Sequence, residues 1–273
     1  MRILMASRGG SYSELALSFG VHLANRVGGS LTLVTAIKQQ ADRSQAEVAQ
    51  ARARQQLGSR GVELQTKIRL GHPAEETIRE AEEGGYDLLI VGERQHQGLM
   101  TRFLGSTTQR IVEQAPCPVI IAKGKIGPIQ RILLCDSNLE EPSLLRRLIA
   151  QLADLVRGEE EVAILHVMSQ ISAWPGVPGK QLRANAEELI REHSPEGQLL
   201  ERDLHLLERF KLQSVPKIRH GLVVDEILAE AREGDYDLVV IGSHQGRGWQ
   251  RILLDDLAHQ IIIQMDRPIL VVR

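Results

Sequence analysis

Short apolar runs alternate with longer amphipathic stretches along the whole chain. In the first half, the apolar runs that predict buried or half-buried strands are Arg2–Ser7, Leu31–Ile37, Val62–Leu70, Leu88–Val91 and Val119–Ala122. The stretches between them are typical of helices, over about residues 11–27, 40–57, 72–83 and 106–114. This alternation predicts repeated strand–helix units and a parallel sheet. Because crossovers between parallel strands are right-handed, we expect a doubly wound sheet of five strands.

The second half of the chain repeats this pattern. Residues 85–122 and 235–272 align at a constant spacing of 150. The pairs of identical residues at this spacing include Tyr86 and Tyr236, Asp87 and Asp237, Gly92 and Gly242, and Pro118 and Pro268. The sequence therefore predicts two tandem α/β domains, each with its own doubly wound five-stranded parallel sheet.

The domain limits follow from the start of the second copy. Arg131 restarts the pattern of Arg2 at a spacing of 129, so the second half carries an insertion of about 21 residues, placed between Met168 and Phe210. We predict a first domain over residues 1–124, a linker over 125–130 and a second domain over 131–273. Surface loops admit insertions easily, so a tolerated surface insertion is the first interpretation, and a lid or partner contact is the alternative.

Composition narrows the class of protein. A hydrophobic content of 42% and a charged content of 25% are those of a soluble globular protein. Aromatic residues make up 3% and the formal net charge is −2, which argues against a nucleic-acid partner. The apolar runs are too short for a membrane span or a signal peptide. The two cysteines, Cys117 and Cys135, are not spaced as a metal or redox pair, so we expect reduced thiols and a cytoplasmic protein.

One loop of the first half carries residues suited to an anion. In a doubly wound sheet, ligands bind where the first and fourth strands end. The loop after the fourth strand runs to Gly105-Ser106-Thr107-Thr108, which opens a helix whose N–H groups suit a phosphate. Arg94, His96 and Arg102 add positive charge to the loop. The alternative is that Ser106 only caps the helix and that the arginines are solvated.

The sequence contains no common catalytic motif and no other phosphate-binding motif. It has no Walker A motif, no His-Glu-x-x-His and no Gly-x-Ser-x-Gly. Paired acids such as Glu82-Glu83 and Glu187-Glu188 are interpreted as solvated helix faces. We therefore expect no metal and no catalytic residues.

These residues carry a resemblance to tandem universal stress proteins that extends over both halves. The family signature is Gly-x-x-Gly, nine residues and Gly-Ser/Thr, followed by a helix and a Pro-Cys-Pro-Val strand, and the first half ends this way at Gly105-Ser106 and Pro116-Cys117-Pro118-Val119. The resemblance implies a Rossmann-like, adenine-nucleotide alpha-hydrolase-like fold, a cytoplasmic stress-response role as sensor or adaptor, and ATP or another adenine nucleotide, with magnesium, as ligand. The phosphate residues that it implies are Gly92, Gly105, Ser106, Thr107 and Thr108.

Both halves depart from the family pattern. In the first half, Gln95 replaces the second glycine of the signature, and Arg8 stands where the family has the aspartate that contacts the adenosine. Arg8 is therefore a candidate for contacting a phosphate or an acidic ligand; the alternatives are a salt bridge with Glu93 and a side chain that fills the emptied adenosine pocket. The second half keeps an aspartate, Asp136, but has Gln245 and the acidic pair Asp255-Asp256 where glycines and serine belong. Two carboxylates there repel a phosphate, so we expect at most one, weakened, nucleotide site.

The resemblance also implies how the halves associate. The last strands, Val119–Ala122 and Ile269–Val272, are apolar, and the family pairs such strands across a pseudo-two-fold axis. A dimer of tandems and an unidentified protein partner are further expectations. Two alternatives to the nucleotide-binding sensor stay open: an interaction or scaffold protein that binds no nucleotide, and a slow ATPase.

Overall fold

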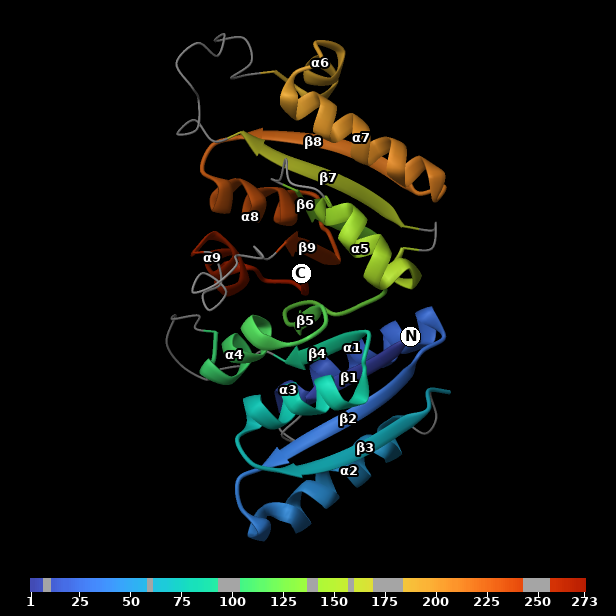
Figure 1. Ribbon diagram of the computed structural model, residues 1–273, viewed down its shortest axis with the longest axis vertical. Coiled ribbons are helices and arrows are strands. Elements are labelled where there is room, and N and C mark those ends of the chain that lie inside the picture. The colour runs from blue at the N-terminus through green and yellow to red at the C-terminus, as the bar shows by residue number, and fades with distance from the viewer. Residues whose placement is uncertain are drawn as a thin grey trace. The chain divides into compact units, whose positions relative to one another are not determined.

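The computed structural model describes residues 1–6, 11–57, 61–92, 104–136, 142–156, 160–168, 184–242 and 256–273, with the backbone alone for 11–14 and 256 (Figure 1). The contacts among these residues divide them into two compact units. Unit 1 comprises 1–128 together with 266–273, and unit 2 comprises 129–242 together with 256–265. The last eight residues of the chain therefore pack with the first half of the sequence.

Unit 1 is built on five parallel strands in the order β3-β2-β1-β4-β5. These strands are β1 (Arg2–Ala6), β2 (Ser30–Ile37), β3 (Leu64–Leu70), β4 (Leu88–Gly92) and β5 (Val119–Ala122). The helices of the unit are α1 (Ser11–Val27), the 3₁₀ turn η1 (Gln40–Asp42), α2 (Arg43–Leu57), α3 (Pro73–Gly84) and α4 (Ser106–Gln114). The reversal of strand order between β1 and β4 confirms a doubly wound sheet.

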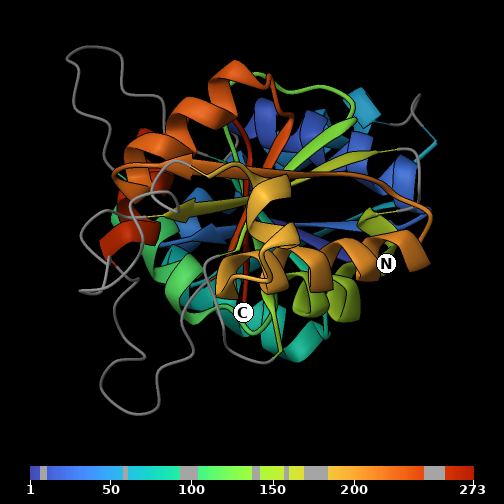
Figure 2. The same ribbon diagram turned by 90° about the horizontal axis from the view of Figure 1, so that it is seen from above.

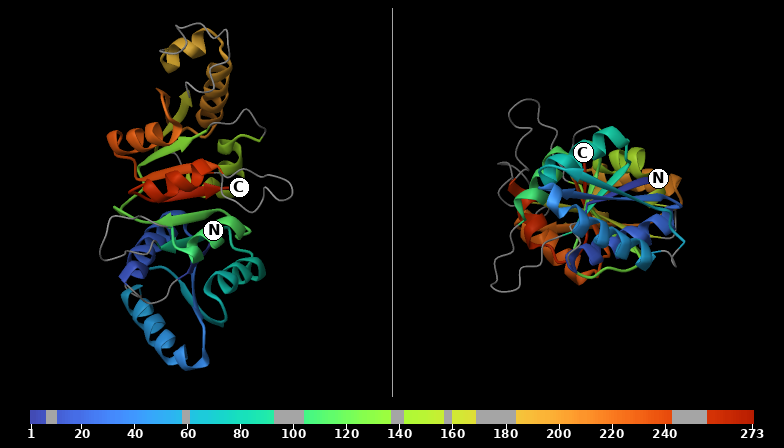
Figure 3. Two further views of the ribbon diagram at one scale, coloured as in Figure 1. Left: turned by 90° about the vertical axis from the view of Figure 1, so that its left-hand side faces the viewer. Right: turned by 90° about the horizontal axis from the view of Figure 1, so that it is seen from below.

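Helices cover both faces of this sheet. α1 and α2 lie on one side and α3 and α4 on the other (Figure 3). The central strands β1, β4 and β5 are buried along nearly their whole length, whereas the edge strand β3 alternates between half-buried and exposed positions. A strand buried on both faces requires a continuous apolar run, which is what these central segments supply.

The expected pairing of the last strands is observed. β10 (Ile269–Val272) pairs antiparallel with β5, with Ile269 opposite Ile121 and Val271 opposite Val119. All four residues of each strand are buried. β10 thereby covers the edge that β5 would otherwise leave open in unit 1.

Unit 2 has four parallel strands in the order β9-β6-β7-β8, which correspond to β4-β1-β2-β3 of unit 1; the predicted fifth strand, β10, instead pairs antiparallel with β5 and belongs to unit 1. These strands are β6 (Arg131–Cys135), β7 (Glu161–Met168), β8 (Gln213–His220) and β9 (Leu238–Gly242). The helices are α5 (Leu144–Leu152), the 3₁₀ turn η2 (Ala153–Leu155), α6 (Ala186–Arg191), α7 (Pro195–Arg209), α8 (Val223–Glu233) and α9 (Asp256–Gln264). α7 and α8 lie on opposite sides of the strands (Figure 2).

The α/β fold class with a mainly parallel sheet is confirmed, and the predicted helix α4 has the expected bounds. Part of the predicted insertion forms the short helix α6, which packs against α7. Residues 169–183 of the insertion lie outside the described part of the chain. The domain limits at 124 and 131 stay a prediction, because the compact units follow packing rather than chain order.

Candidate functional site

The carboxyl ends of β1 and β4 lie side by side in unit 1. The register pairs Ala6 with Val91, and Gly92 pairs on the other side with Ala122 of β5. The loops that follow, residues 7–10 and 93–103, lie outside the described residues, and so do the candidate Arg8 and the departure Gln95. Of the predicted site residues, Gly92 is thus placed at the strand crevice where doubly wound sheets bind ligands.

The other predicted residues form the start of α4. Gly105 is the N-cap, with φ −60° and ψ 141°, and Ser106, Thr107 and Thr108 make up the first turn. Ser106 is exposed and the two threonines are half-buried. A helix between parallel strands runs antiparallel to them, so α4 begins at the edge where β4 ends (Figure 1). The fold therefore brings Gly92 and the Gly105–Thr108 turn to the same edge of unit 1.

The start of α4 has the features of an anion site. The Gly105 cap makes no side-chain hydrogen bond to the first turn, which contains no acidic residue. A Cβ built on Gly105 meets no described atom within 4 Å, so none of the described residues obstructs a ligand on this side. The first N–H groups of a helix have no intrahelical acceptor, and the helix dipole favours negative charge at this end. Hydroxyls on three successive residues add donors.

In unit 2, side chains of α5 lie close to the end of β9. A Cβ built on Gly242, the counterpart of Gly92, lies 3.0 Å from Nη2 of Arg147 and 3.5 Å from Cδ1 of Leu144. The matching helix, α9, begins at Asp256, a carboxylate residue where α4 has Ser106. Gln245 and Asp255 of the second loop lie outside the described residues, and of Asp256 only the backbone is described.

Asp136 is buried at the end of β6, and its carboxylate accepts a hydrogen bond from within the protein. Its side chain is 2% exposed, and its Oδ2 accepts a hydrogen bond of 3.2 Å from the N–H of Leu144 at the start of α5. Asp136 therefore stabilises the N-terminus of that helix.

A second buried carboxylate, Asp203 of α7, lies nearby and is fully buried. Its Oδ1 accepts hydrogen bonds from Nε of Arg202 (3.0 Å) and Oγ of Ser143 (3.3 Å), whereas Oδ2 has no partner among the described residues. Burial raises the pKa of Asp203 to about 6; the Arg202 hydrogen bond opposes this shift, and the negative charge of Asp136 adds to it. This pair could not be predicted from the sequence, because Asp203 lies on a helix far along the chain from Asp136.

The strand registers correct one correspondence between the copies. Ala6 pairs with Val91 in unit 1, and Cys135 pairs with Ile241 in unit 2. Since Val91 and Ile241 are equivalent at the spacing of 150, Ala6 is equivalent to Cys135, and Asp136 therefore corresponds to Ser7. Arg8 therefore lies one position after Ser7, the residue that is equivalent to the aspartate.

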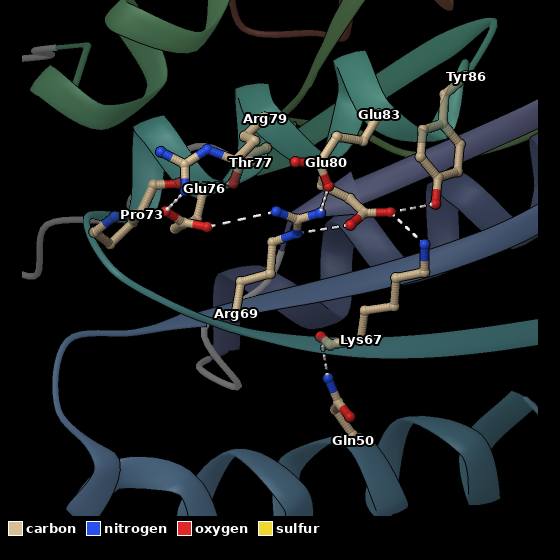
Figure 4. A network of polar contacts seen from close by, with 10 residues as sticks. All are labelled: Gln50, Lys67, Arg69, Pro73, Glu76, Thr77, Arg79, Glu80, Glu83 and Tyr86. Carbon is tan, nitrogen blue, oxygen red and sulfur yellow. Dashed lines mark hydrogen bonds and ion pairs between the residues drawn. The ribbon is translucent and has the colours of Figure 1, made fainter.

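A buried charge network links β3 to α3 in unit 1 (Figure 4). Its centre is Glu80, which is 1% exposed and binds Nζ of Lys67 (2.5 Å), Nε of Arg69 (2.7 Å) and the hydroxyl of Tyr86 (2.9 Å). Arg69 also pairs with Glu76 and Glu83. Burial alone raises the pKa of Glu80, but the hydrogen bonds from Lys67, Tyr86 and Arg69 outweigh it and hold this pKa below its ordinary value.

Unit 2 contains the same network at the spacing of 150. Glu230 binds Nε of Arg219 (2.6 Å), the hydroxyl of Tyr236 (3.0 Å) and, more loosely, Nζ of Lys217 (3.7 Å). Arg219 also pairs with Glu226 and Glu233. The pKa of Glu230 is likewise held below its ordinary value, as hydrogen bonds from Arg219 and Tyr236 overcome the effect of burial.

Arginines complete both networks. The guanidinium of Arg2 lies 5.1 Å from the ring centre of Tyr86, and that of Arg131 lies 5.0 Å from the ring centre of Tyr236. These networks are not among the predictions made from the sequence; Glu83, expected on a solvated helix face, is exposed and also pairs with Arg69. A signal existed, because the lysine, arginine, glutamates and tyrosine all recur at the spacing of 150.

Other site types find no support in the described residues. Within them, no group of three or more His, Cys, Asp or Glu side chains can hold a metal. Cys117 and Cys135 are free, and burial raises the pKa of the Cys117 thiol to about 12, which makes it a poor nucleophile. A search of the described helices finds none that is long and apolar enough to cross a membrane.

Comparison with known proteins identifies both halves. The model of the universal stress protein family matches residues 1–123 and 128–273. Universal stress protein YxiE of Bacillus subtilis is 34% identical over 71 residues, which are 26% of this chain and 48% of that protein. Universal stress protein MJ0531 of Methanocaldococcus jannaschii is 36% identical over 63 residues, or 23% and 37% of the two chains. The chain thus spans less than half the length of these curated relatives.

Solved structures match over the whole chain. A universal stress protein from Archaeoglobus fulgidus has a TM-score of 0.77 at 16% identity, with 100% of this chain and 98% of that chain covered. A functionally unknown protein from Pseudomonas aeruginosa PAO1 has a TM-score of 0.72 at 19% identity, with 99% and 92% covered. At these identities the likeness shows the fold alone.

Proposed function

The chain belongs to the universal stress protein family, and from this membership we propose that it is a cytoplasmic stress-response sensor or adaptor that binds an adenine nucleotide in unit 1. The observation that carries the proposal is the start of α4. There, a glycine cap without a side-chain hydrogen bond precedes three hydroxyl residues, with open space in front of Gly105. Both free cysteines fit a reducing compartment.

Each residue has a specific task in this proposal. The N–H groups of Ser106, Thr107 and Thr108 bind phosphate oxygens, and the hydroxyls of the same residues donate further hydrogen bonds. Gly105 and Gly92 leave room for the ligand to approach the backbone. Magnesium, bound together with ATP, supplies charge neutralisation on the phosphates. Arg8 stays a candidate for an additional contact with a phosphate.

Calorimetric titration with ATP, ADP and AMP, with and without magnesium, tests the proposal. We expect binding of ATP to wild-type protein and its loss in Gly105→Asp, because the new carboxylate places negative charge where the phosphate binds. Gly127→Asp is a matched control. A Cβ at Gly127 also meets no described atom within 4 Å, and this variant introduces the same charge away from α4. Equal affinities of the two variants would refute the assignment of the site.

A second candidate function is that of an interaction protein that binds no nucleotide. It is favoured by unit 2, where Arg147 and Leu144 occupy the space in front of Gly242. Absence of binding for all three nucleotides would favour this candidate. Sedimentation of the wild-type protein then tests the proposed dimer of tandems.

A further inference from the structure

The last residue of the chain caps the helix that begins at the proposed nucleotide site. Arg273, which follows β10, donates hydrogen bonds from Nη1 to the carbonyl oxygen of Ala115 (2.7 Å) and from Nη2 to that of Val112 (2.5 Å). Val112 lies in the last turn of α4, and Ala115 is its C-cap. The guanidinium thus contacts the end of α4 opposite to Gly105.

α4 lacks a cap of this kind within its own sequence. Its last turn contains no basic residue, although the last carbonyl groups of any helix lack intrahelical partners. Arg273 supplies both hydrogen-bond donors and the positive charge that the C-terminal end of a helix favours. A helix of nine residues is marginal by itself, so contacts at one end affect the order of the whole helix.

The segment that carries Arg273 is itself held firmly in unit 1. β10 pairs with β5 over three residue pairs. Before β10, the backbone of Asp266 packs on Gly124, where a built Cβ would lie 1.7 Å from the carbonyl oxygen of Asp266. Arg273 is therefore presented to α4 by a strand whose position is fixed by tertiary contacts.

The position equivalent to Arg273 in the first copy also carries a basic residue. Lys123 follows β5 as Arg273 follows β10, at the spacing of 150, and its side chain is 2% exposed. Burial of a lysine is rare unless the side chain serves a partner. Both copies therefore place a basic side chain directly after their last strand.

We propose that Arg273 is a positioning residue for the anion site of unit 1: by capping the C-terminus of α4, it keeps the N–H groups of Ser106, Thr107 and Thr108 in place for a phosphate. This inference rests on the proposed function. An ordered helix start binds more tightly because less conformational freedom is lost when the ligand arrives. The residue that supports the site of the first copy thus lies at the C-terminal end of the second copy.

Two measurements on Arg273→Ala test the inference. Amide hydrogen exchange without ligand reports the order of α4, and calorimetry reports the affinity for ATP. We expect exchange at residues 109–115, whose N–H groups bond within the helix, to become faster and ATP binding to weaken, each by about tenfold. Arg273→Lys keeps the charge but loses the two-pronged geometry, so partial recovery is expected. Arg43→Ala is the control, because it removes an exposed arginine whose ion pair among the described residues is with Glu47 of the same helix.

The outcomes separate the inference from the proposed function. Unchanged exchange in α4, with ATP binding retained, overturns the inference alone. Faster exchange with unchanged ATP affinity overturns it as well, since the cap then has no effect on the site. Wild-type protein that does not bind ATP refutes the proposed function and, with it, the role of Arg273 in ligand binding. If Arg273→Ala does not fold, the comparison of Arg273→Lys with wild type decides.

Discussion

The hydroxyl of Tyr86 donates a hydrogen bond of 2.9 Å to the carboxylate of Glu80, and both side chains are buried. Tyr236 and Glu230 repeat this contact at 3.0 Å in unit 2. The two copies differ at the turn of Gly105-Ser106 and Asp255-Asp256 but keep this interaction, together with the lysine and arginine that neutralise the glutamate. The duplication has thus preserved a charge network that links β3 to α3 and β8 to α8.

Removing the centre of a network should destabilise the protein strongly. We expect Glu80→Ala to lower the free energy of unfolding by about 1–3 kcal/mol, because it leaves the buried hydroxyl of Tyr86 without its acceptor and removes one of the carboxylates that pair with Arg69. Urea denaturation measures the change. Glu47→Ala is the control, since Glu47 belongs to an exposed pair with Arg43 and should cost less than about 1 kcal/mol. Equal losses in the two variants would mean that the network contributes no more than a surface pair.

The Asp136–Asp203 pair should give unit 2 an unusual pH dependence. The pKa of Asp203 is raised to about 6 in the folded state, so between about pH 4 and pH 6 the folded protein binds more protons than the unfolded chain. Its contribution to stability therefore falls as pH rises through this window. We expect Asp203→Asn to be more stable than wild type at pH 8, by up to about 3 kcal/mol, and equal to it near pH 4.

Thermal unfolding at a series of pH values checks this difference. Glu80 provides the opposite case, because its lowered pKa makes its stabilisation disappear as pH falls below about 4. A constant difference between Asp203→Asn and wild type from pH 4 to pH 8 would contradict the assignment of the raised pKa to Asp203.

Gly124 should be intolerant of any side chain. Its φ is +62°, and a Cβ would lie 1.7 Å from the carbonyl oxygen of Asp266. We expect Gly124→Ala to lower the unfolding free energy by more than about 1 kcal/mol, because both the backbone conformation and the contact with the β10 segment are disturbed. Gly127→Ala has open space and should change it by less than about 0.5 kcal/mol. A tolerated Gly124→Ala would show that the segment can move away without cost.

Restoring the phosphate turn in unit 2 should not by itself create a second site. We expect Asp255→Gly with Asp256→Ser to leave the number of ATP sites in calorimetry unchanged, because Arg147 and Leu144 still occupy the space in front of Gly242. Adding Arg147→Ala would open part of that space. A second site in the double variant would show that the two carboxylates alone prevent binding.

The sequence by itself determined the repeat, the strand–helix alternation and the bounds of α4. These features depend on local periodicity and on residues such as Gly105, whose effect on the helix start is local. It also predicted that the last strands pair, through the resemblance to the family. The alignment of Arg8 with the missing aspartate is off by one residue: the spacing of 129 between Arg2 and Arg131 already places Ser7 opposite Asp136, and the pairing of Ala6 with Val91 agrees with it.

Only the tertiary structure decided which distant residues act together. Nothing local in the sequence connects Arg273 to Val112 and Ala115, or Asp203 to Ser143, because such contacts arise when elements far apart in the chain pack against each other. The same holds for the compact units: β10 belongs with unit 1 because it buries its apolar face and edge against β5, whatever its place in the chain. Periodicity fixes which elements form, whereas burial of their surfaces fixes which of them meet.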